Sequence, residues 1–367
     1  MQLGIRPPPF RNLGKGNSSS SSGAPPTSGT AAGAPPRGPS GAQLDDRPRP
    51  FRNLGNTCYM SATLVALFGP THLRDYFTAT SSILSEEERA QLLLIARAAD
   101  KSLDLTEPEE TTADQLLAET YRLSFEKPRG TPQSPNLIYN RYPNVACEQQ
   151  DAHEFLVRLV SDAPTLDANL ATWVRPSLRC SECGAARMRP QEKHCVLSVD
   201  IRNNSGAIHT LQQALDIWLQ PERMPLDYRW KCSSPACGSA APPSKHNTIS
   251  SSPNVLVLHL KRWPPGASEG LIDALVEPTP TLQFDDKIYH LRSVILHRGA
   301  TASSGHYVAV MHQPLGEASQ WWHYDDSCRR AVIPRHMTRV WKTYMCIYEQ
   351  PASGDVHAPR RLPVSGL

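Results

Sequence analysis

The segment Arg52–Met60 constrains the fold of this chain more than any other stretch, because it places a cysteine at the predicted start of a helix. Gly55 permits a tight turn shortly before Cys58. Apolar residues then follow at close to helical spacing, until Gly69-Pro70 ends the pattern. The unpaired N–H groups and the positive end of the helix dipole would both favour a thiolate on Cys58.

Two interpretations of Cys58 are open at this point. A lone cysteine is most often a buried structural residue, because free cysteine is among the most buried residue types. The alternative is a nucleophile, which is served by a nearby hydrogen-bond donor for a developing oxyanion. Asn53 offers a side-chain amide just before the cysteine. A nucleophilic cysteine also needs a histidine and a group that orients it, so the rest of the chain must supply both.

Composition excludes several classes of function. The chain has 367 residues, enough for one large domain or two ordinary ones, and its formal net charge of +3 is too small to argue for nucleic-acid binding. We find no run of eighteen apolar residues, so no membrane span is predicted, and the N-terminus lacks the apolar region of a secretory signal. Nine cysteines without such a signal favour metal binding or catalysis over a disulfide framework.

The two ends of the chain differ from its middle. Residues 1–47 are rich in Pro, Gly and Ser and are predicted to be disordered, as is the short polar tail 351–367. The folded domain is expected over 48–350. Within the N-terminal segment, Phe10–Gly14 repeats Phe51–Gly55 without the following Thr-Cys. Chance or a duplicated fragment explains this copy better than a pseudosubstrate that occupies a cleft.

Helical patterns occupy much of the first half of the domain. Glu86–Ala99 is predicted to be a helix, and Thr112 with Gln115 resembles a capping box that opens another. The proline- and glycine-rich stretch 127–143 is predicted to be a loop. The next helix opens within Glu148–Leu156, and its apolar face consists of Ala152, Phe155, Leu156, Leu159 and Val160. Asp151 and Glu154 lie beside that face, where carboxylates are usually just solvated.

Four cysteines fall into two short-spaced pairs, Cys180-x-x-Cys183 and Cys232-x4-Cys237. Two such pairs suit a tetrahedral zinc site with four thiolates, although the second pair has a longer spacing than the usual two residues. Each pair is followed by a glycine, as tight metal-binding turns often require. His194 and Cys195 are adjacent spare ligands, but neighbours on a strand point to opposite faces, so we expect them to be packing residues.

The last third of the domain has strand patterns. These segments are predicted as short strands of a mostly antiparallel sheet: Asn254–Trp263, Tyr289–Leu296, His306–Met311, Trp321–Tyr324 and Thr343–Glu349. A hairpin from His306 to Asp325, with a loop of roughly eight to ten residues by strand spacing, would bring these two side chains together. A histidine on a strand is nevertheless most often structural, and we expect this of His153, His259 and His312.

Five segments of the chain, taken in order, resemble the sequence boxes of the ubiquitin-specific proteases. They are Asn53 with Gly55–Ser61, Gln149–Phe155, the two cysteine pairs, Pro253–Trp263, and His297–Ser327 with its Gly305-His306-Tyr307 and Trp322-His323-Tyr324-Asp325-Asp326 strings. The resemblance implies an α+β, papain-like cysteine protease fold. It would have a helical lobe, an antiparallel β lobe and a zinc-ribbon-like finger insert, roughly residues 175–245.

The resemblance also implies roles for particular residues. Cys58 would be the nucleophile, His306 the general base and acid, and Asp325, the first acidic residue after the aromatic, would orient the imidazole. Asn53 would form the oxyanion hole together with the backbone N–H of Cys58. Asp326 would support them, by orienting Asn53, a water or the histidine.

Two further sites follow from the same resemblance. Asp151 and Glu154 would border the channel for the arginine-bearing C-terminal tail of ubiquitin, with Asp151 the first choice. Cys180, Cys183, Cys232 and Cys237 would hold a structural zinc ion, although some members of the family have lost the metal and a metal-free relic stays open.

The implied function is hydrolysis of the isopeptide or peptide bond after the C-terminal glycine of ubiquitin, through a thioester on Cys58. The alternatives are a protease for another ubiquitin-like modifier and a non-catalytic scaffold that binds ubiquitin. Expected partners are ubiquitin and ubiquitinated proteins, with no nucleic acid and no membrane. We expect a monomer in the cytosol or nucleus.

Overall fold

The computed structural model describes residues 47–97, 111–126, 131–142, 149–203, 206–208, 210–263, 271–315, 318–333 and 341–351. The chain divides into two compact units, 1–45 and 46–367, and every described residue belongs to the second. The predictions for the N-terminal segment, its Phe10–Gly14 copy and most of the C-terminal tail therefore lie outside the described residues.

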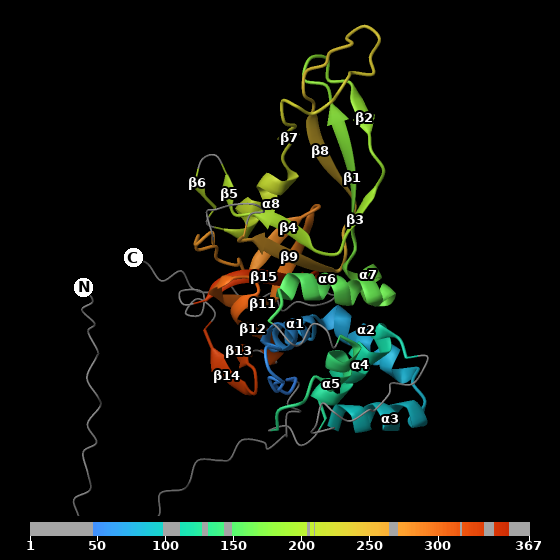
Figure 1. Ribbon diagram of the computed structural model, residues 1–367, viewed down its shortest axis with the longest axis vertical. Coiled ribbons are helices and arrows are strands. Elements are labelled where there is room, and N and C mark those ends of the chain that lie inside the picture. Colours follow the sequence, from blue (N-terminus) through green and yellow to red (C-terminus); the bar gives the residue numbers. More distant parts are fainter. Residues whose placement is uncertain are drawn as a thin grey trace, which may run out of the picture. The chain divides into compact units, whose positions relative to one another are not determined.

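Helices precede most of the strands along the chain (Figure 1). The helices are α1 (Cys58–Leu67), α2 (Thr71–Ser82), α3 (Glu86–Arg97), α4 (Ala113–Ser124), α5 (Asn136–Arg141), α6 (Ala152–Asp162), α7 (Pro164–Leu170) and α8 (Leu211–Leu219). The strands are β1 (Thr172–Arg179), β2 (Ala186–Met188), β3 (Glu192–His194), β4 (Leu197–Asp200), β5 (Arg202–Asn203), β6 (Gly206–Ala207), β7 (Glu222–Arg223), β8 (Ser244–Ser251), β9 (Val255–Lys261), β10 (Thr281–Phe284), β11 (Lys287–Thr301), β12 (Ser304–Leu315), β13 (Ala318–Asp325), β14 (Cys328–Val332) and β15 (Lys342–Glu349).

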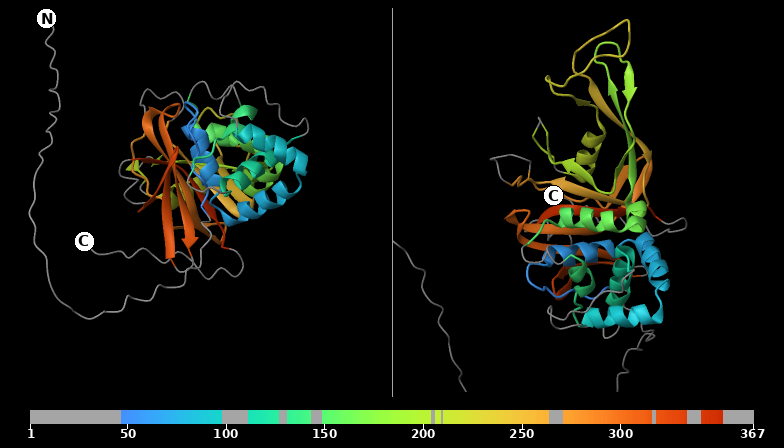
Figure 2. Two further views of the ribbon diagram at one scale, coloured as in Figure 1. Left: turned by 90° about the horizontal axis from the view of Figure 1, so that it is seen from below. Right: turned by 45° about the vertical axis from the view of Figure 1, so that its right-hand side comes forward.

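The principal sheet has the strand order β14-β13-β12-β11-β15-β9-β4, with β10 beside β11. Its pairs are antiparallel except for β4 with β9. The antiparallel sheet predicted from the strand patterns is therefore confirmed. It lies beside the helical layer, as Figure 2 (left) shows for the orange strands and the blue to green helices.

Helix α1 lies in the core between the sheet and the other helices. It contacts β11, β12 and β13 on one side and α6 on the other. All ten of its residues are buried, which explains why the helix is apolar almost all round rather than on one stripe. Thr63 meets its hydrogen-bonding need within the helix, since its hydroxyl donates to the carbonyl of Tyr59 at 2.8 Å.

The cysteine pairs lie on a second sheet, whose strand order is β2-β1-β8-β7 with β3 also paired to β1. In Figure 1 these strands extend away from the principal sheet, and the loop between β7 and β8 lies at their far end. Apart from β1, these strands contain no buried residue, and all three residues of β2 are exposed. Packing alone therefore provides little to stabilise this insert.

Of three predictions in the helical half of the domain, two are confirmed over the described residues and one is wrong in part. The capping box is confirmed, because Thr112 and Gln115 exchange hydrogen bonds at the start of α4. Helix α3 is confirmed up to Arg97, while the end predicted at Ala99 lies outside the described residues. The loop predicted over 127–143 is wrong in part, because it contains the short helix α5. Pro135 precedes that helix at a position where a missing N–H costs nothing, and two apolar side chains after it are buried.

The predicted hairpin loop of about eight to ten residues is also wrong. Strands β12 and β13 continue to the pair Leu315↔Ala318, so the connection is short. The polar run with Pro314 conceals this extension, but beyond Met311 strand β12 pairs only with β13. This part of β12 is therefore an edge strand, and within sheets proline is tolerated at such edges.

Within the described residues, no helix is both long and apolar enough to cross a membrane.

Candidate active site

The cysteine segment has the geometry that its sequence predicts. Gly55 and Asn56 both have positive φ angles, 93° and 56°, so the chain reverses just before α1. Glycine and asparagine are the residues that tolerate this conformation best. Cys58 is then the first residue of α1 and is 2% exposed.

No side chain caps the start of α1. Thr57 occupies the cap position, but its hydroxyl accepts from the backbone N–H of Leu54 at 2.9 Å. The first-turn N–H groups of the helix are thereby left without a side-chain acceptor. The dipole and these donors favour negative charge at the position of the Cys58 sulfur.

His306 reaches this sulfur from β12, near the start of the strand. Its Nε2 lies 2.7 Å from Asp325 Oδ1, which leaves Nδ1 for Cys58. The hydrogen bond with Cys58 raises the pKa of His306 to about 9; burial opposes this shift, and Asp325 and Asp326 add to it. His306 is therefore protonated at neutral pH.

Two glycines hold the His306 end of the β11–β12 hairpin close together. A Cβ on Gly299 would lie 2.1 Å from the Ser304 carbonyl oxygen, and one on Gly305 would lie 2.3 Å from the Arg298 carbonyl oxygen. Gly305 also has φ +122°, which L side chains rarely adopt. The hairpin therefore requires glycine at both positions. The register between β11 and β12 is irregular here, and this irregular stretch determines where His306 lies on β12.

The Asn53 amide is held from both ends. Its Oδ1 accepts from the backbone N–H groups of Gly55 and Thr57 at 3.0 and 3.1 Å. Its Nδ2 donates to Asp326 Oδ2 at 3.0 Å. Because a side-chain amide has two N–H hydrogens, one remains for a ligand beside Cys58.

Asp326 links the two halves of the site. It occupies the two-residue turn between β13 and β14 with φ +47°, a conformation that Asp tolerates. Its Oδ2 lies 3.9 Å from His306 Nε2, farther than Asp325, and it accepts the hydrogen bond from Asn53. Burial raises the pKa of the Asp326 carboxyl, while Asn53 and His306 oppose that shift.

The two acidic residues on α6 have different surroundings. Asp151 caps the helix by accepting from the His153 N–H at 2.6 Å, and Tyr344 donates to its two oxygens at 2.5 and 2.6 Å. Glu154 is exposed in the first turn of α6. Tyr344 was not singled out in the sequence, because no local pattern marks a tyrosine that contacts a residue nearly two hundred positions earlier.

Three histidines outside the catalytic group fit the structural role expected of them. The rings of His153 and His259 stack at 3.9 Å, and burial lowers the pKa of both. Burial also lowers the pKa of His312 to about 4. These side chains are therefore neutral at physiological pH and do not compete with His306 as the base.

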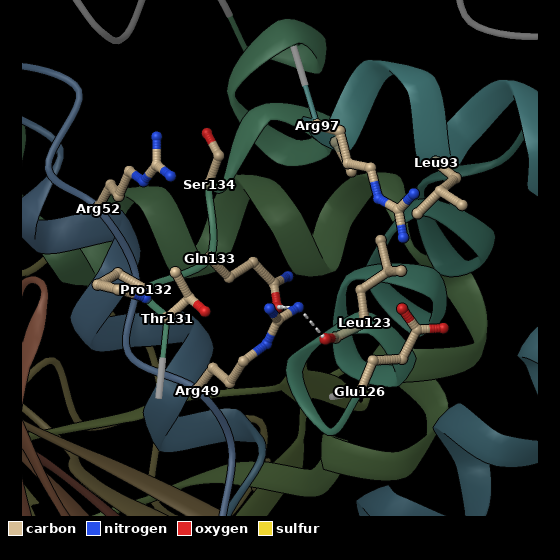
Figure 3. Close-up of a pocket in the computed structure, with 11 residues that line it drawn as sticks. Arg49, Arg52, Leu93, Arg97, Leu123, Glu126, Thr131, Pro132, Gln133 and Ser134 are labelled. Carbon is tan, nitrogen blue, oxygen red and sulfur yellow. Dashed lines mark hydrogen bonds between the residues drawn. The ribbon is translucent and has the colours of Figure 1, made fainter. Parts of the chain in front are cut away.

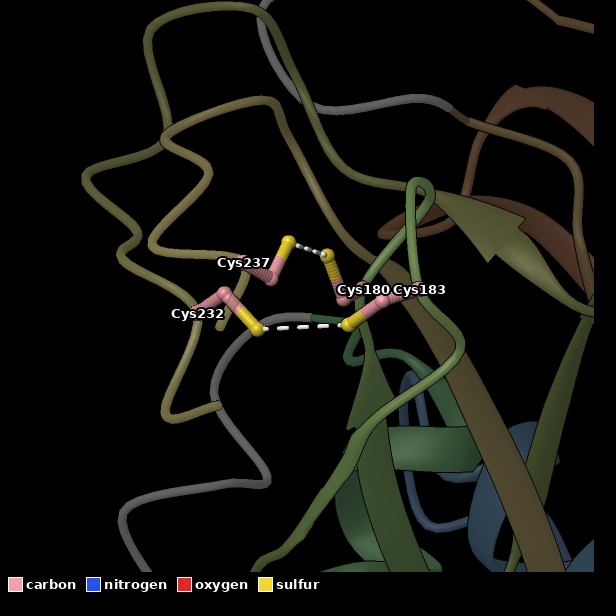
Figure 4. Close-up of side chains that lie close together, drawn as sticks. All are labelled: Cys180, Cys183, Cys232 and Cys237. Carbon is pink, nitrogen blue, oxygen red and sulfur yellow. Dashed lines mark hydrogen bonds between the residues drawn. The ribbon is translucent and has the colours of Figure 1, made fainter. Parts of the chain in front are cut away.

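The four paired cysteines come together at the turns of the second sheet (Figure 4). Cys180 Sγ lies 3.9 Å from Cys237 Sγ, and Cys183 Sγ lies 3.6 Å from Cys232 Sγ. All four sulfurs lie within 4.8 Å of one another. A disulfide needs about 2.05 Å, whereas sulfurs around a tetrahedral zinc with bonds of about 2.3 Å lie roughly 3.8 Å apart.

The backbone explains why the longer second pair still fits. The N–H groups of Cys237 and Gly238 both bond to the Ser234 carbonyl at 3.1 Å, so the four intervening residues fold into a tight turn. Gly184 and Gly238 have φ angles of +72° and +59° in open space. Backbone hydrogen bonds from Cys183 and Glu182 lower the pKa of Cys180 to about 7, which favours a metal-binding thiolate. The donor set therefore suits a metal ion.

His194 and Cys195 lie away from this cluster. The His194 ring packs edge-on against Trp218, and the Cys195 sulfur lies 2.6 Å from Asp167 Oδ1. The expectation that they are packing residues agrees with these contacts.

A comparison with family profiles identifies the domain. The profile of the ubiquitin carboxyl-terminal hydrolases matches residues 50–348. The chain belongs to the ubiquitin carboxyl-terminal hydrolase family. The resemblance drawn from the five sequence boxes is thereby confirmed, and residues 58, 306 and 325 all lie within the match.

Curated relatives share this assignment at low identity. Ubiquitin carboxyl-terminal hydrolase 36 of Drosophila grimshawi is 24% identical over 340 residues, which cover 83% of this chain and 25% of that protein. Ubiquitin carboxyl-terminal hydrolase 16 of Arabidopsis thaliana is 26% identical over 261 residues, covering 60% of this chain and 24% of the relative. The chain thus spans about a quarter of the length of these relatives.

Solved structures share the fold. The SAGA DUB module of Ubp8, Sgf11, Sus1 and Sgf73 bound to monoubiquitin matches with a TM-score of 0.61 and 20% identity, over 86% of this chain and 72% of the matched one. A yeast SAGA DUB module structure matches with a TM-score of 0.63, also at 20% identity, over 86% of this chain and 71% of the matched one. The predicted α+β fold of the protease family is confirmed.

Proposed function

We propose that this chain is a deubiquitinating cysteine protease that hydrolyses the bond after the C-terminal glycine of ubiquitin. One observation carries the proposal: His306 bonds to Cys58 on one side and to Asp325 on the other, within the family match. A solved structure of similar fold is bound to monoubiquitin, and another to ubiquitin aldehyde. Both support ubiquitin as the substrate.

The proposed reaction begins at the sulfur. The Cys58 thiolate attacks the carbonyl carbon of the terminal glycine, and the oxygen of the tetrahedral intermediate accepts hydrogen bonds from the Cys58 N–H and the free Asn53 N–H. His306 then donates its proton to the departing amine, which leaves a thioester on Cys58. A water molecule, activated by the now neutral imidazole, attacks the thioester and releases the ubiquitin carboxylate.

The neighbouring carboxylates serve orientation in this scheme. Asp325 keeps Nε2 of His306 protonated and Nδ1 directed at the sulfur. Asp326 holds the Asn53 amide, which keeps one donor aimed at the developing oxyanion. This second carboxylate is therefore proposed to position Asn53 rather than to orient the histidine, since its oxygen lies 3.9 Å from Nε2.

Glu154 and Asp151 are proposed to recognise the tail of the substrate. Glu154 is exposed in the first turn of α6, where it can accept a charge-assisted hydrogen bond from an arginine. Asp151 shares its oxygens with Tyr344 and the α6 backbone, so it would hold the channel wall in place as well as contact the tail.

We further propose that the four cysteines hold zinc. Zinc would join the turn after β1 to the turn between β7 and β8 and so stabilise an insert with few apolar contacts. The proposed catalytic residues lie on α1 and on the principal sheet, so the metal would act on the insert and not on the chemistry.

Turnover of a fluorogenic ubiquitin substrate tests the function. Cys58→Ala should abolish turnover and keep ubiquitin affinity within roughly tenfold, because the substitution removes the nucleophile and little contact area. Cys346→Ala, at a buried cysteine of β15, is the control that should retain turnover if the protein folds. Turnover by Cys58→Ala would refute the assignment, and activity only with another modifier would favour the alternative substrate.

A further inference from the structure

A cavity lined by arginines lies on the helical side of the domain, away from the cysteine cluster (Figure 3). It has a volume of about 330 Å³, which is near the lower end of the range for small-ligand sites, about 300–1,000 Å³. Among its described lining residues, Arg49, Arg52 and Arg97 carry positive charge and Glu126 carries the one carboxylate.

The carboxylate does not neutralise these arginines. Glu126 is engaged by Arg122, which also pairs with Glu119. Among the residues that the structure describes, Arg49, Arg52 and Arg97 make no ion pair. Like charges in one hollow repel each other, so the cavity favours an anion that balances more than one of them.

The Arg49 guanidinium is held in place but has spare capacity. Its Nη2 donates to the Leu123 carbonyl at 2.6 Å, and to Gln133 Oε1 at a long 3.4 Å. Its Nε is buried without a hydrogen-bond partner. A buried unpaired donor costs free energy, and a ligand oxygen in the cavity would remove that cost.

Arg97 approaches the same space from another element. Figure 3 shows its guanidinium extending from the end of α3 over Leu123, across the cavity from Arg49, while the Arg52 guanidinium lies on the far side of Gln133 and points away from both. The pKa of Arg49 is lowered chiefly by burial and further by the charge of Arg97, while Glu126 opposes the shift. Two guanidinium groups that line one cavity from different elements suit an oxyanion with several acceptor oxygens.

We propose that this cavity binds a phosphate ester group. The two ordinary sources are a free phosphorylated small molecule and a phosphorylated serine or threonine side chain. A dianionic phosphate balances two of the three arginines and offers more acceptor oxygens than a carboxylate. The other polar walls add few donors, because Ser134 donates to Asn136 and Gln133 donates to the Thr120 carbonyl.

The cavity is connected to the catalytic segment. Arg52 N–H donates to the Gln133 carbonyl, and Gln133 N–H donates to the Pro50 carbonyl, each at 2.7 Å. Phe51 lies between these bonds and is fully buried. A phosphate held by Arg49 would therefore brace the residues that lead directly into Asn53.

Isothermal titration calorimetry at low ionic strength tests the proposal, with glycerol 3-phosphate, a free phosphate ester, and a short phosphoserine peptide as separate probes. We expect both to bind, and the tighter of the two identifies the source. Arg97→Gln should weaken binding by at least about tenfold, the effect of losing one charge-assisted hydrogen bond. Arg175→Gln removes an exposed arginine of β1 and should bind like the unmodified protein.

Three results would overturn the proposal. One is a heat of titration with either phosphate probe that does not exceed the heat measured with sodium chloride at matched ionic strength. Another is equal weakening by Arg97→Gln and Arg175→Gln, which would mean that only net charge matters. The third is equal binding of an unphosphorylated peptide with aspartate in place of phosphoserine. Circular dichroism of each variant checks that the fold is kept, and none of these readouts depends on protease activity.

Discussion

At the scale of single residues, the site depends on charge held at one histidine. The pKa of His306 is raised to about 9, first by Cys58 and then by Asp325. The histidine therefore carries its proton through the physiological range. The interaction that raises this pKa stabilises the folded protein fully below pH 6.5, and the stabilisation is lost as the pH rises through about 9.

The pH dependence of turnover follows from that shift. The kcat/KM of the unmodified protein should fall as the pH rises through about 9, because neutral His306 cannot protonate the departing amine. Asp325→Asn removes a carboxylate that raises this pKa, so the alkaline limb should move to lower pH. Asp286→Asn, in the exposed turn before β11, is the matched control. An unmoved limb in Asp325→Asn would contradict the orienting role.

Asn53 and Asp326 make a second prediction at this scale. Asn53→Ala should lower kcat by about 10²–10³-fold with little change in ubiquitin affinity, because the lost donor acts on the transition state. Asp326→Asn keeps an oxygen that can accept from Asn53, so it should cost much less than Asp326→Ala. Equal losses in both Asp326 variants would show that its charge, not its hold on Asn53, matters. Single-turnover rates with a fluorogenic ubiquitin substrate measure these differences.

At the scale of elements, the hairpin of β11 and β12 positions the base. Gly299 and Gly305 allow the strands to approach more closely than any side chain would permit. Next to these glycines, Arg298 of β11 pairs with His306 of β12. A disturbance of the hairpin end therefore displaces His306 while it leaves the Cys58 helix in place.

Gly305→Ala tests this element. The new Cβ would meet the Arg298 carbonyl oxygen at 2.3 Å at a φ of +122°, so we expect more than about 1 kcal/mol of destabilisation in urea unfolding. Turnover should fall further than the folded fraction does. Gly184→Ala is the control, because its φ is +72° in open space and it lies far from His306 in the chain. Turnover in Gly305→Ala that merely follows the folded fraction would contradict the positioning role.

The sequence predicts an element well where neighbouring residues carry a recognisable pattern, and poorly where they do not. The α4 capping box and the apolar face of α6 are local patterns, so they were predictable from a few residues. Strands β2 and β8 were not, since they are mostly polar, have no fully buried residue and form through pairing with β1. Helix α5 was missed because it has only six residues, too few for a clear helical pattern, and the prolines around it indicate a loop.

The site was predictable to a similar extent. Cys58, His306 and Asp325 lie in strings that resemble one family in order, and the structure brings them together. The Asp151–Tyr344 contact and the buried Arg262, which donates to the carbonyls of Thr343 and Ile272, have no such signal. They depend on pairing between distant strands, which a single sequence does not reveal.

At the scale of the whole molecule, the chemistry and the cysteine cluster lie on different sheets. Metal removal should therefore change how substrate binds more than how fast it reacts. Metal analysis should find about one zinc per chain. Cys232→Ser or chelation should lower the melting temperature and raise KM for ubiquitin, with kcat changed less. Cys195→Ser, at a cysteine outside the cluster and away from the catalytic residues, is the matched control. Metal-free protein with unchanged stability and KM would contradict the zinc proposal.

Intact mass spectrometry after treatment with a ubiquitin-derived electrophile tests the central claim most directly. The account predicts one covalent ubiquitin adduct, which peptide mapping places on Cys58 and which Cys58→Ala does not form. An adduct on any other cysteine, or reversible binding without an adduct in folded protein, would contradict it.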